Sequence, residues 1–166
     1  MKTNIVILGL DYEYNLDIAQ LLADKTSLYF LDVKQYLNYS LFSRQEMEAK
    51  CGIDYLIKQE NSVVKSCADF ENTIICMPYM YFFRDNIYQR FFDNCEIIYL
   101  YFSKQKLQKI AYNNSSDNTL AIDILAFEDR NADINKISNI KVCVSNKNKQ
   151  TVVKEILNNL GVTCEY

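Results

Sequence analysis

Apolar runs typical of buried strands alternate along the chain with segments whose apolar residues recur at helical spacing. The strand-like runs cover residues 5–10, 27–32, 72–78, 95–102 and 140–144. Helical patterns cover residues 54–70, 82–92, 120–131 and 151–160, and a first helix carries Ile18, Leu21 and Leu22 on one face. This alternation predicts an α/β fold: a three-layer sandwich with a five-stranded parallel sheet and helices on both faces.

Local signals sharpen a few of these boundaries. The segment Ser43-Arg-Gln-Glu46 has the spacing of a capping box and predicts the start of a short helix that Gly52 ends. The only proline, Pro78, stops the third strand. A length of 166 residues, 49% of them hydrophobic, suits one compact domain, so we expect a single domain over residues 1–166.

The charge balance excludes several classes of partner. A net charge of −3 and a pI near 5.0 provide no basic field for nucleic acid or for an anionic membrane surface. No apolar run approaches the roughly 20 residues that a bilayer span requires, and the first strand begins almost at Met1. We therefore expect no signal peptide and a cytoplasmic protein.

The cysteines do not have the spacing of a metal site. No two lie closer than nine positions and the chain has no histidine; the six are Cys51, Cys67, Cys76, Cys95, Cys143 and Cys164. Structural zinc sites usually present close cysteine or histidine pairs, so reduced core cysteines are expected. The lack of histidine also excludes hydrolase triads with an imidazole base. We predict no metal and no cofactor.

The connection after the first strand has the spacing of a phosphate-binding loop but not its chemistry. That loop, G-x-x-x-x-G-K-[S/T], holds phosphate with backbone N–H groups, a lysine and a hydroxyl. Here only Gly9 is kept, and the remaining motif positions hold Tyr14, Asn15, Leu16 and Asp17. Three carboxylates fall where a triphosphate would lie: Asp11, Glu13 and Asp17. We expect the helix to begin near residues 15–17 with its N–H groups satisfied by side chains such as Asp17.

Three further segments make the chain, over roughly residues 4–160, resemble shikimate kinase, a P-loop kinase. Leu28-Tyr-Phe-Leu-Asp32-Val-Lys34 is similar to that family's second strand, which ends F-x-D-x-D. Residues 52–60 are similar to its G-E-x-x-F-R-x-x-E segment, and residues 125–137 to its L-x-x-x-R-x-P-L-Y segment. The resemblance implies a P-loop NTPase, shikimate-kinase-like fold.

The same resemblance assigns expected roles to single residues. Asp32 matches the aspartate that helps organise magnesium, whereas Lys34 replaces the aspartate that binds substrate hydroxyls. Arg130 matches one substrate arginine, and Ile57 replaces the other, although Glu60 is kept. Met77, Pro78 and Tyr79 stand in place of a glycine triplet, and the polar tract 113–119, where a lid is expected, lacks arginines.

The losses favour a pseudoenzyme, because phosphoryl transfer depends on positioning and charge neutralisation. We expect it to act through protein interaction or regulation, with an unknown protein or small molecule as partner and a homo-oligomer possible. Two alternatives stay open: a small-molecule binder that uses Asp32 and Arg130, and an active shikimate or other small-molecule kinase. Loop carboxylates could also hold a metal or a basic partner, but ordinary solvation explains them more simply.

Four tyrosines are candidates for an interaction site. We define the mouth as the Tyr12/Tyr14 segment, residues 77–81 and the tract 113–119, which should meet at the carboxyl ends of the strands, where open α/β sheets bind ligands. Tyr12, Tyr14, Tyr79 and Tyr81 are expected to surround it. For Phe82, Phe83, Phe91 and Phe92, packing between helix and sheet is the favoured interpretation.

Overall fold

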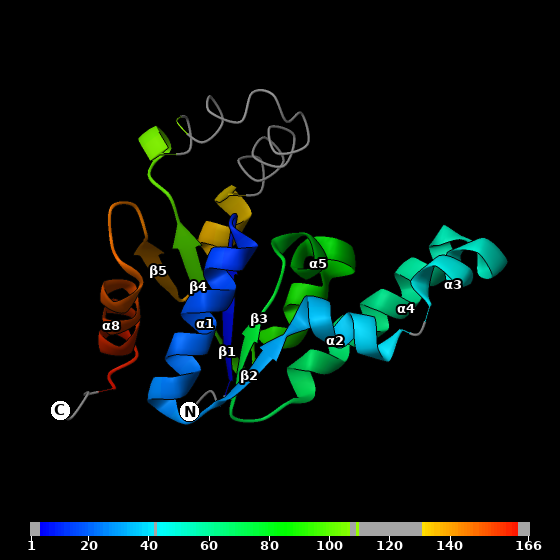
Figure 1. Cartoon of the computed structure of the whole chain (residues 1–166), viewed down its shortest axis with the longest axis horizontal. Helices are drawn as coiled ribbons and strands as arrows, with labels where there is room; N and C mark the ends of the chain where they lie inside the picture. Colours follow the sequence, from blue (N-terminus) through cyan, green and yellow to red (C-terminus); the bar gives the residue numbers. More distant parts are fainter. Residues whose placement is uncertain (1–3, 42, 107–108, 110–130, 163–166) are drawn as a thin grey trace.

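The computed structural model describes residues 4–41, 43–106, 109 and 131–162, and their core is one parallel sheet (Figure 1). The strands are β1 (Asn4–Gly9), β2 (Tyr29–Asp32), β3 (Thr73–Cys76), β4 (Cys95–Tyr101) and β5 (Ile140–Cys143). Their order is β2-β3-β1-β4-β5, and every neighbouring pair is parallel. The predicted α/β fold with a five-stranded parallel sheet is confirmed.

Helices cover both faces of this sheet, because alternate strand residues are apolar on each side. On one face, Ile5 and Ile7 of β1 pack in a cluster with α1 (Tyr12–Thr26) and α8 (Lys149–Asn159). On the other, Val6 and Leu8 pack with α2 (Val33–Ser40) and α4 (Ile53–Ser66). Every residue of β1 is buried, as expected for a central strand of a three-layer sandwich.

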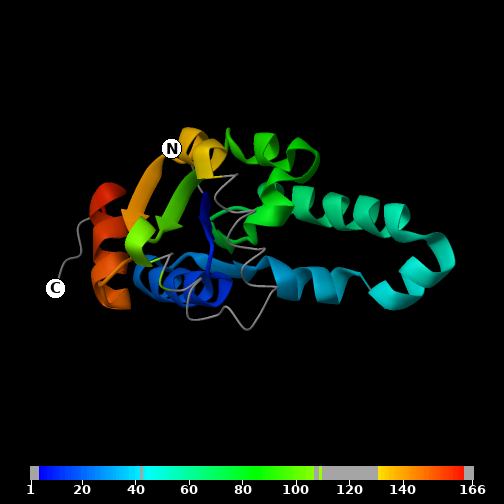
Figure 2. The same ribbon diagram turned by 90° about the horizontal axis from the view of Figure 1, so that it is seen from above.

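On the second face, α3 and the outer part of α4 extend away from the sheet as an arm (Figures 1 and 2). Helix α3 (Arg44–Cys51) has no buried residue, and Gly52, with φ of 86°, separates it from α4. The predicted short helix that follows Ser43 and ends at Gly52 is confirmed, but the hydrogen bond of a capping box is not formed by Ser43. Ser43 has a left-handed backbone (φ 54°) and no side-chain cap bond, whereas N-cap residues are typically extended. After α4, a short turn η1 (Cys67–Asp69) leads toward β3.

The aromatic segment after β3 forms two short helices instead of the continuous helix predicted over residues 82–92. Helix α5 (Tyr79–Phe83) is followed by the 3-10 segment η2 (Arg84–Phe91). The break comes at Asp85 and Asn86, which both have left-handed backbones (φ 50° and 54°). Core packing of the phenylalanines is confirmed, since Phe82 and Phe91 are fully buried and Phe83 and Phe92 pack against the same cluster.

The parallel arrangement brings the carboxyl ends of β1, β2 and β3 to one edge of the sheet, where α1, α2 and α5 begin. Residues 131–137 are helical and place buried Ile134 against Tyr99 of β4. The predicted helix over residues 120–131 lies almost wholly outside the described residues. Within the described part of the chain, no helix has the length and apolar character needed to cross a bilayer.

Candidate functional site

The connection between β1 and α1 consists only of Leu10 and Asp11. Asp11 is the N-cap of α1: its carboxylate accepts a hydrogen bond from the backbone N–H of Tyr14 (3.0 Å), and its carbonyl accepts one from Asn15 (3.0 Å). The expectation that the helix begins near residues 15–17 is wrong. Aspartate is a favoured N-cap, and because no glycine follows Gly9 to keep the chain out of helical geometry, the helix extends back almost to the strand.

Asp17 is not the cap that was expected, because it lies within α1 on an exposed surface. Its carboxylate pairs with the ammonium of Lys149 at the start of α8. The Lys149 ammonium also lies 5.8 Å from the centre of the Tyr14 ring. The hydrogen bond from Lys149 to Asp17 raises the pKa of that lysine. Asp17 therefore links α1 to α8.

Asn15 stands at the position of the phosphate-loop lysine and is 1% exposed. Its side chain lies against Gly9: a β-carbon built on Gly9 would be 2.7 Å from Asn15 Oδ1 and 2.7 Å from the Leu100 carbonyl oxygen. Asn15 Nδ2 has no hydrogen-bond partner among the described residues. Leu16 is half-buried and packs with the cluster between α1, α8 and the sheet. The side chains of this turn thus fill the space beside the end of β1.

Tyr12 connects the carboxyl ends of β2 and β3. Its hydroxyl donates to Asp32 Oδ1 (2.7 Å), and the carbonyl oxygen of Cys76 lies 3.2 Å from the same hydroxyl. Burial, together with the hydrogen bond to Asp32, raises the pKa of the Tyr12 phenol well above its ordinary value. The ammonium of Lys34 lies 4.2 Å from the centre of the Tyr12 ring. The aspartate that resembles a magnesium ligand is therefore bonded to a phenol of its own chain.

Asp32 also has a structural task at the start of α2. Its Oδ1 accepts the backbone N–H of Gln35 (3.1 Å), which makes Asp32 the N-cap of that helix. Lys34 follows in the first turn and is exposed. Asp32 and Lys34 thus both contact Tyr12: Asp32 accepts its hydroxyl hydrogen bond, and the Lys34 ammonium lies over its ring.

The other three predicted tyrosines pack against different hydrophobic clusters. Tyr14 packs near Phe102, with ring centres 6.2 Å apart, on the α1 and α8 side. Tyr79 packs with the small cluster of Tyr99 and Ile134, and Tyr81 packs with the cluster on the opposite face. The four tyrosines therefore pack against three clusters, Tyr12 and Tyr14 against the same one, and their placement around one mouth stays a prediction. Arg130 and the tract 113–119 lie outside the described residues.

A group of charged residues that sequence reasoning missed lies beside Tyr81. Glu60 of α4 is 4% exposed and pairs through Oε1 with Arg44 of α3 and through Oε2 with Arg84 (2.9 Å). Arg44 Nη2 lies 3.5 Å from the Tyr81 hydroxyl, and the Arg84 guanidinium carbon lies 4.8 Å from the Tyr81 ring centre. Burial lowers the pKa of Arg44, but the bond to Tyr81 and the charge of Glu60 outweigh it, so the net shift is upward.

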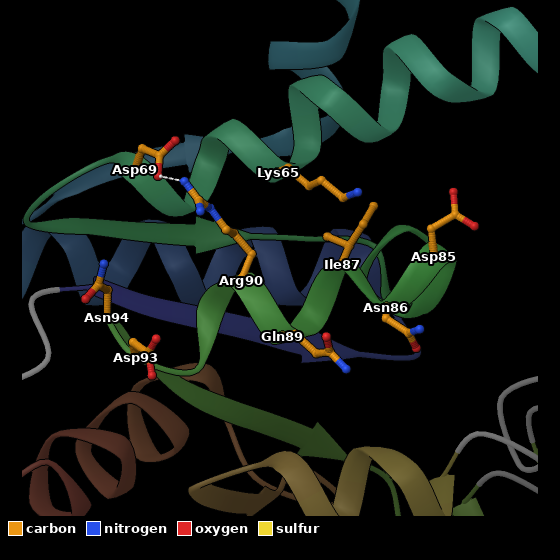
Figure 3. A pocket seen from close by; sticks show the side chains of 9 residues that line it. All are labelled: Lys65, Asp69, Asp85, Asn86, Ile87, Gln89, Arg90, Asp93 and Asn94. Atoms are coloured by element: carbon orange, nitrogen blue, oxygen red, sulfur yellow. Dashed lines mark hydrogen bonds and ion pairs between the residues drawn. The ribbon is translucent and has the colours of Figure 1, made fainter.

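A separate polar cavity of about 590 Å³ lies near the amino ends of β3 and β4, away from the mouth (Figure 3). Its lining includes Lys65, Asp93 and the exposed ion pair of Arg90 with Asp69 (2.9 Å). Figure 3 shows these side chains arranged around an open surface between η2 and the end of α4. Charges of both signs alternate around it, which is typical of a solvated protein surface.

The cysteines and carboxylates of the described residues form no metal site. No group of three or more such side chains is placed to hold an ion in the part of the chain that the structure describes. Cys67 and Cys76 are buried thiols outside any disulfide, and burial raises the pKa of both, that of Cys67 to about 12. These thiols therefore stay protonated at neutral pH, as core residues do.

Comparison with known proteins agrees with this fold. The family model described as shikimate kinase matches residues 17–161. The chain belongs to the shikimate kinase family. The match begins at Asp17, so it leaves out β1 and the first turn of α1. No protein with a curated description matches the chain.

Solved shikimate kinases share the fold at low sequence identity. The enzyme from Bacteroides thetaiotaomicron is 14% identical, with 96% of this chain and 98% of that chain covered and a TM-score of 0.75. The enzyme from Aquifex aeolicus is 21% identical, with 95% and 96% covered and a TM-score of 0.70. The enzyme from Acinetobacter baumannii, solved with shikimate, is 12% identical, with 98% and 96% covered and a TM-score of 0.70.

Proposed function

We propose that this member of the shikimate kinase family is a pseudoenzyme that binds no nucleotide and acts through protein interaction. The observation that carries the proposal is the immediate start of α1 at Tyr12. A phosphate-binding loop holds its backbone N–H groups open toward the anion. Here the Asp11 carboxylate accepts the Tyr14 N–H, the helix takes up its regular bonding at Asn15, and the Asn15 side chain is packed against Gly9.

The residues at the end of β1 do not fit a magnesium nucleoside triphosphate. Asp11 and Glu13 are exposed at the start of α1, where their charges would repel phosphate. Asp32, which resembles a magnesium ligand, accepts hydrogen bonds from Tyr12 and Gln35 through Oδ1. Since phosphoryl transfer depends on positioning and charge neutralisation, these features support the loss of catalysis.

The surface that supports an interaction role is the part of the mouth formed by α5. Met80 is 57% exposed, although it lies between half-buried Tyr79 and Tyr81. Tyrosine, methionine and arginine are enriched in the cores of protein interfaces. Tyr81 is also in contact with Arg44 and Arg84, which fixes its orientation. We therefore place the partner-binding surface here.

The test of nucleotide binding is a thermal shift with millimolar magnesium-ATP. A ligand at about 100 times its dissociation constant stabilises a fold by about 2.7 kcal/mol, which should raise the melting temperature of such a domain by roughly 5 °C or more. For this protein we expect no measurable shift, because Asp11 and Asn15 occupy the start of α1.

The shikimate kinase from Acinetobacter baumannii, treated identically, serves as the positive control. A reproducible shift of several degrees for the present protein would show that nucleotide binds and would overturn the pseudoenzyme proposal.

The test of the interaction role is the double variant Met80→Ser, Tyr81→Ser. We expect it to weaken capture of the protein partner isolated from the native cell extract by about 30-fold, which corresponds to about 2 kcal/mol, the hot-spot scale. Tyr29→Ser is the matched control, because Tyr29 is 74% exposed at the amino end of β2, away from the mouth. Equal capture by the double variant and the control would place the interface elsewhere. Circular dichroism checks that both variants fold.

A further inference from the structure

The unusual chemical feature beside Tyr81 is one buried carboxylate shared by two arginines. Glu60 uses one carboxylate oxygen for Arg44 and the other for Arg84, so both of its oxygens are occupied. Glu60, Arg44 and Arg84 together therefore carry one net positive charge. Because the arginine side chains are 36% and 26% exposed, that surplus charge is accessible from outside.

The two guanidinium groups retain unused hydrogen-bond donors. Each guanidinium has five N–H groups, and among the described residues the hydrogen bonds of both arginines come from Nη2 alone. Arginine forks bind carboxylates in a bidentate manner, so a second carboxylate from outside fits the donors that Glu60 leaves free.

The surroundings favour a peptide over an enclosed small molecule. A hollow of about 230 Å³ lies beside Arg44 where α2 meets α3, lined also by Asn38, Leu41, Ser43 and Gln45. Pockets for small ligands usually measure about 300–1,000 Å³, so this hollow suits one side chain. Met80, the residue before Tyr81 in α5, has an exposed side chain. An apolar contact, a charged contact and a shallow hollow together make a surface for an extended segment.

We propose that the surface formed by Arg44, Tyr81 and Arg84 binds an acidic peptide segment of a partner protein. A glutamate or aspartate of that segment pairs with the two guanidinium groups, and neighbouring side chains contact Met80 and the hollow beside Arg44. Glu60 holds both arginines in place from below and keeps them oriented outward. This inference rests on the proposed interaction role and specifies the chemistry of the partner.

The experiment compares two pools of short random peptides by fluorescence polarisation. One pool is rich in Glu and Leu, and the other has Gln at every Glu position. We expect the Glu pool to bind and the Gln pool to bind about tenfold more weakly, the scale of a hydrogen bond to a charged group. Binding of the Glu pool should also fall as salt increases. Equal binding of the two pools, or no binding of either, would overturn the inference.

Single variants locate the binding surface. Arg44→Gln and Arg84→Gln should each weaken binding of the Glu pool by about tenfold, whereas Arg90→Gln should leave it unchanged. Arg90 is a matched control because it also pairs with a carboxylate, Asp69, but lines the separate cavity (Figure 3) and does not pair with Glu60. Unchanged binding of the Glu pool by both Arg44→Gln and Arg84→Gln would contradict the proposal.

Folding and ligand class are tested separately. Each Gln variant leaves Glu60 with one arginine, and thermal melting verifies that the variant folds. If a Gln variant fails to fold, Arg44→Lys or Arg84→Lys takes its place. Lysine keeps the positive charge but lacks the two-pronged guanidinium donor. Stabilisation by citrate that depends on Arg44, without binding of the Glu pool, would assign the arginines to a small organic acid and overturn the peptide proposal. A further outcome separates the two proposals. If the Met80→Ser, Tyr81→Ser variant loses partner capture while Arg44→Gln and Arg84→Gln both retain it fully, the acidic-peptide proposal is overturned. The proposed interaction role then remains intact.

Discussion

Replacing Phe82 by alanine should lower the free energy of unfolding by about 3–5 kcal/mol, the usual cost of removing a buried aromatic side chain. Phe82 is the fully buried residue of α5, and its ring centre lies 5.5 Å from that of Phe91 and 5.6 Å from that of Phe83. Truncation would leave a cavity that the short helices α5 and η2 cannot close without moving. Urea denaturation followed by circular dichroism measures the loss.

The matched control is Phe70→Ala, because Phe70 is 38% exposed and makes an edge contact with Tyr36. Its truncation should cost about 1 kcal/mol, the value for a partly exposed aromatic pair. Since Tyr81 and Arg84 lie close to Phe82 in sequence, the Phe82 variant should also bind the partner more weakly. A loss of stability no larger than that of the control would mean that the aromatic cluster repacks and does not anchor α5.

The sheet could be predicted because central parallel strands are buried on both faces and therefore appear as continuous apolar runs. Residues 5–8 and 97–100 are of this kind, and they pair along almost their whole length. Local signals were less reliable. The break at Asp85 and Asn86 involves two left-handed residues that are not glycine, a conformation that sequence patterns seldom reveal.

The candidate site was predicted only in part, because its decisive contacts join residues far apart in the chain. Tyr12 and Asp32 were both singled out, but the hydrogen bond between them depends on the early start of α1. One signal for the arginine pair was available. Glu60 is kept although Ile57 replaces the substrate arginine of that segment, and a buried carboxylate requires a cation from elsewhere. Arg44 and Arg84 supply it from α3 and η2.

Gly9 has a different purpose here from that of a phosphate-loop glycine. Its backbone is not left-handed, so its value lies in the space that it leaves for Asn15 and for the Leu100 carbonyl oxygen. Gly9→Ala would place a β-carbon 2.7 Å from both Asn15 Oδ1 and that carbonyl oxygen. Because the carbonyl belongs to the central strand β4 and cannot move freely, we expect the free energy of unfolding to fall by about 3 kcal/mol. Urea denaturation is again the measurement.

Two further variants separate the cost of the steric clash at Gly9 from the cost of backbone strain. Gly161→Ala changes a glycine with φ of 71° and nothing within 4 Å of its β-carbon, so it should cost only about 1 kcal/mol of backbone strain. Adding Asn15→Ala to Gly9→Ala should recover part of the lost stability, because it removes one of the two clashes and also a buried amide without a partner among the described residues. If Gly9→Ala alone keeps the stability of the original protein, the first turn of α1 must move away from β1 at little cost. The loop could then open, and the main structural reason for excluding a phosphate from it would fail.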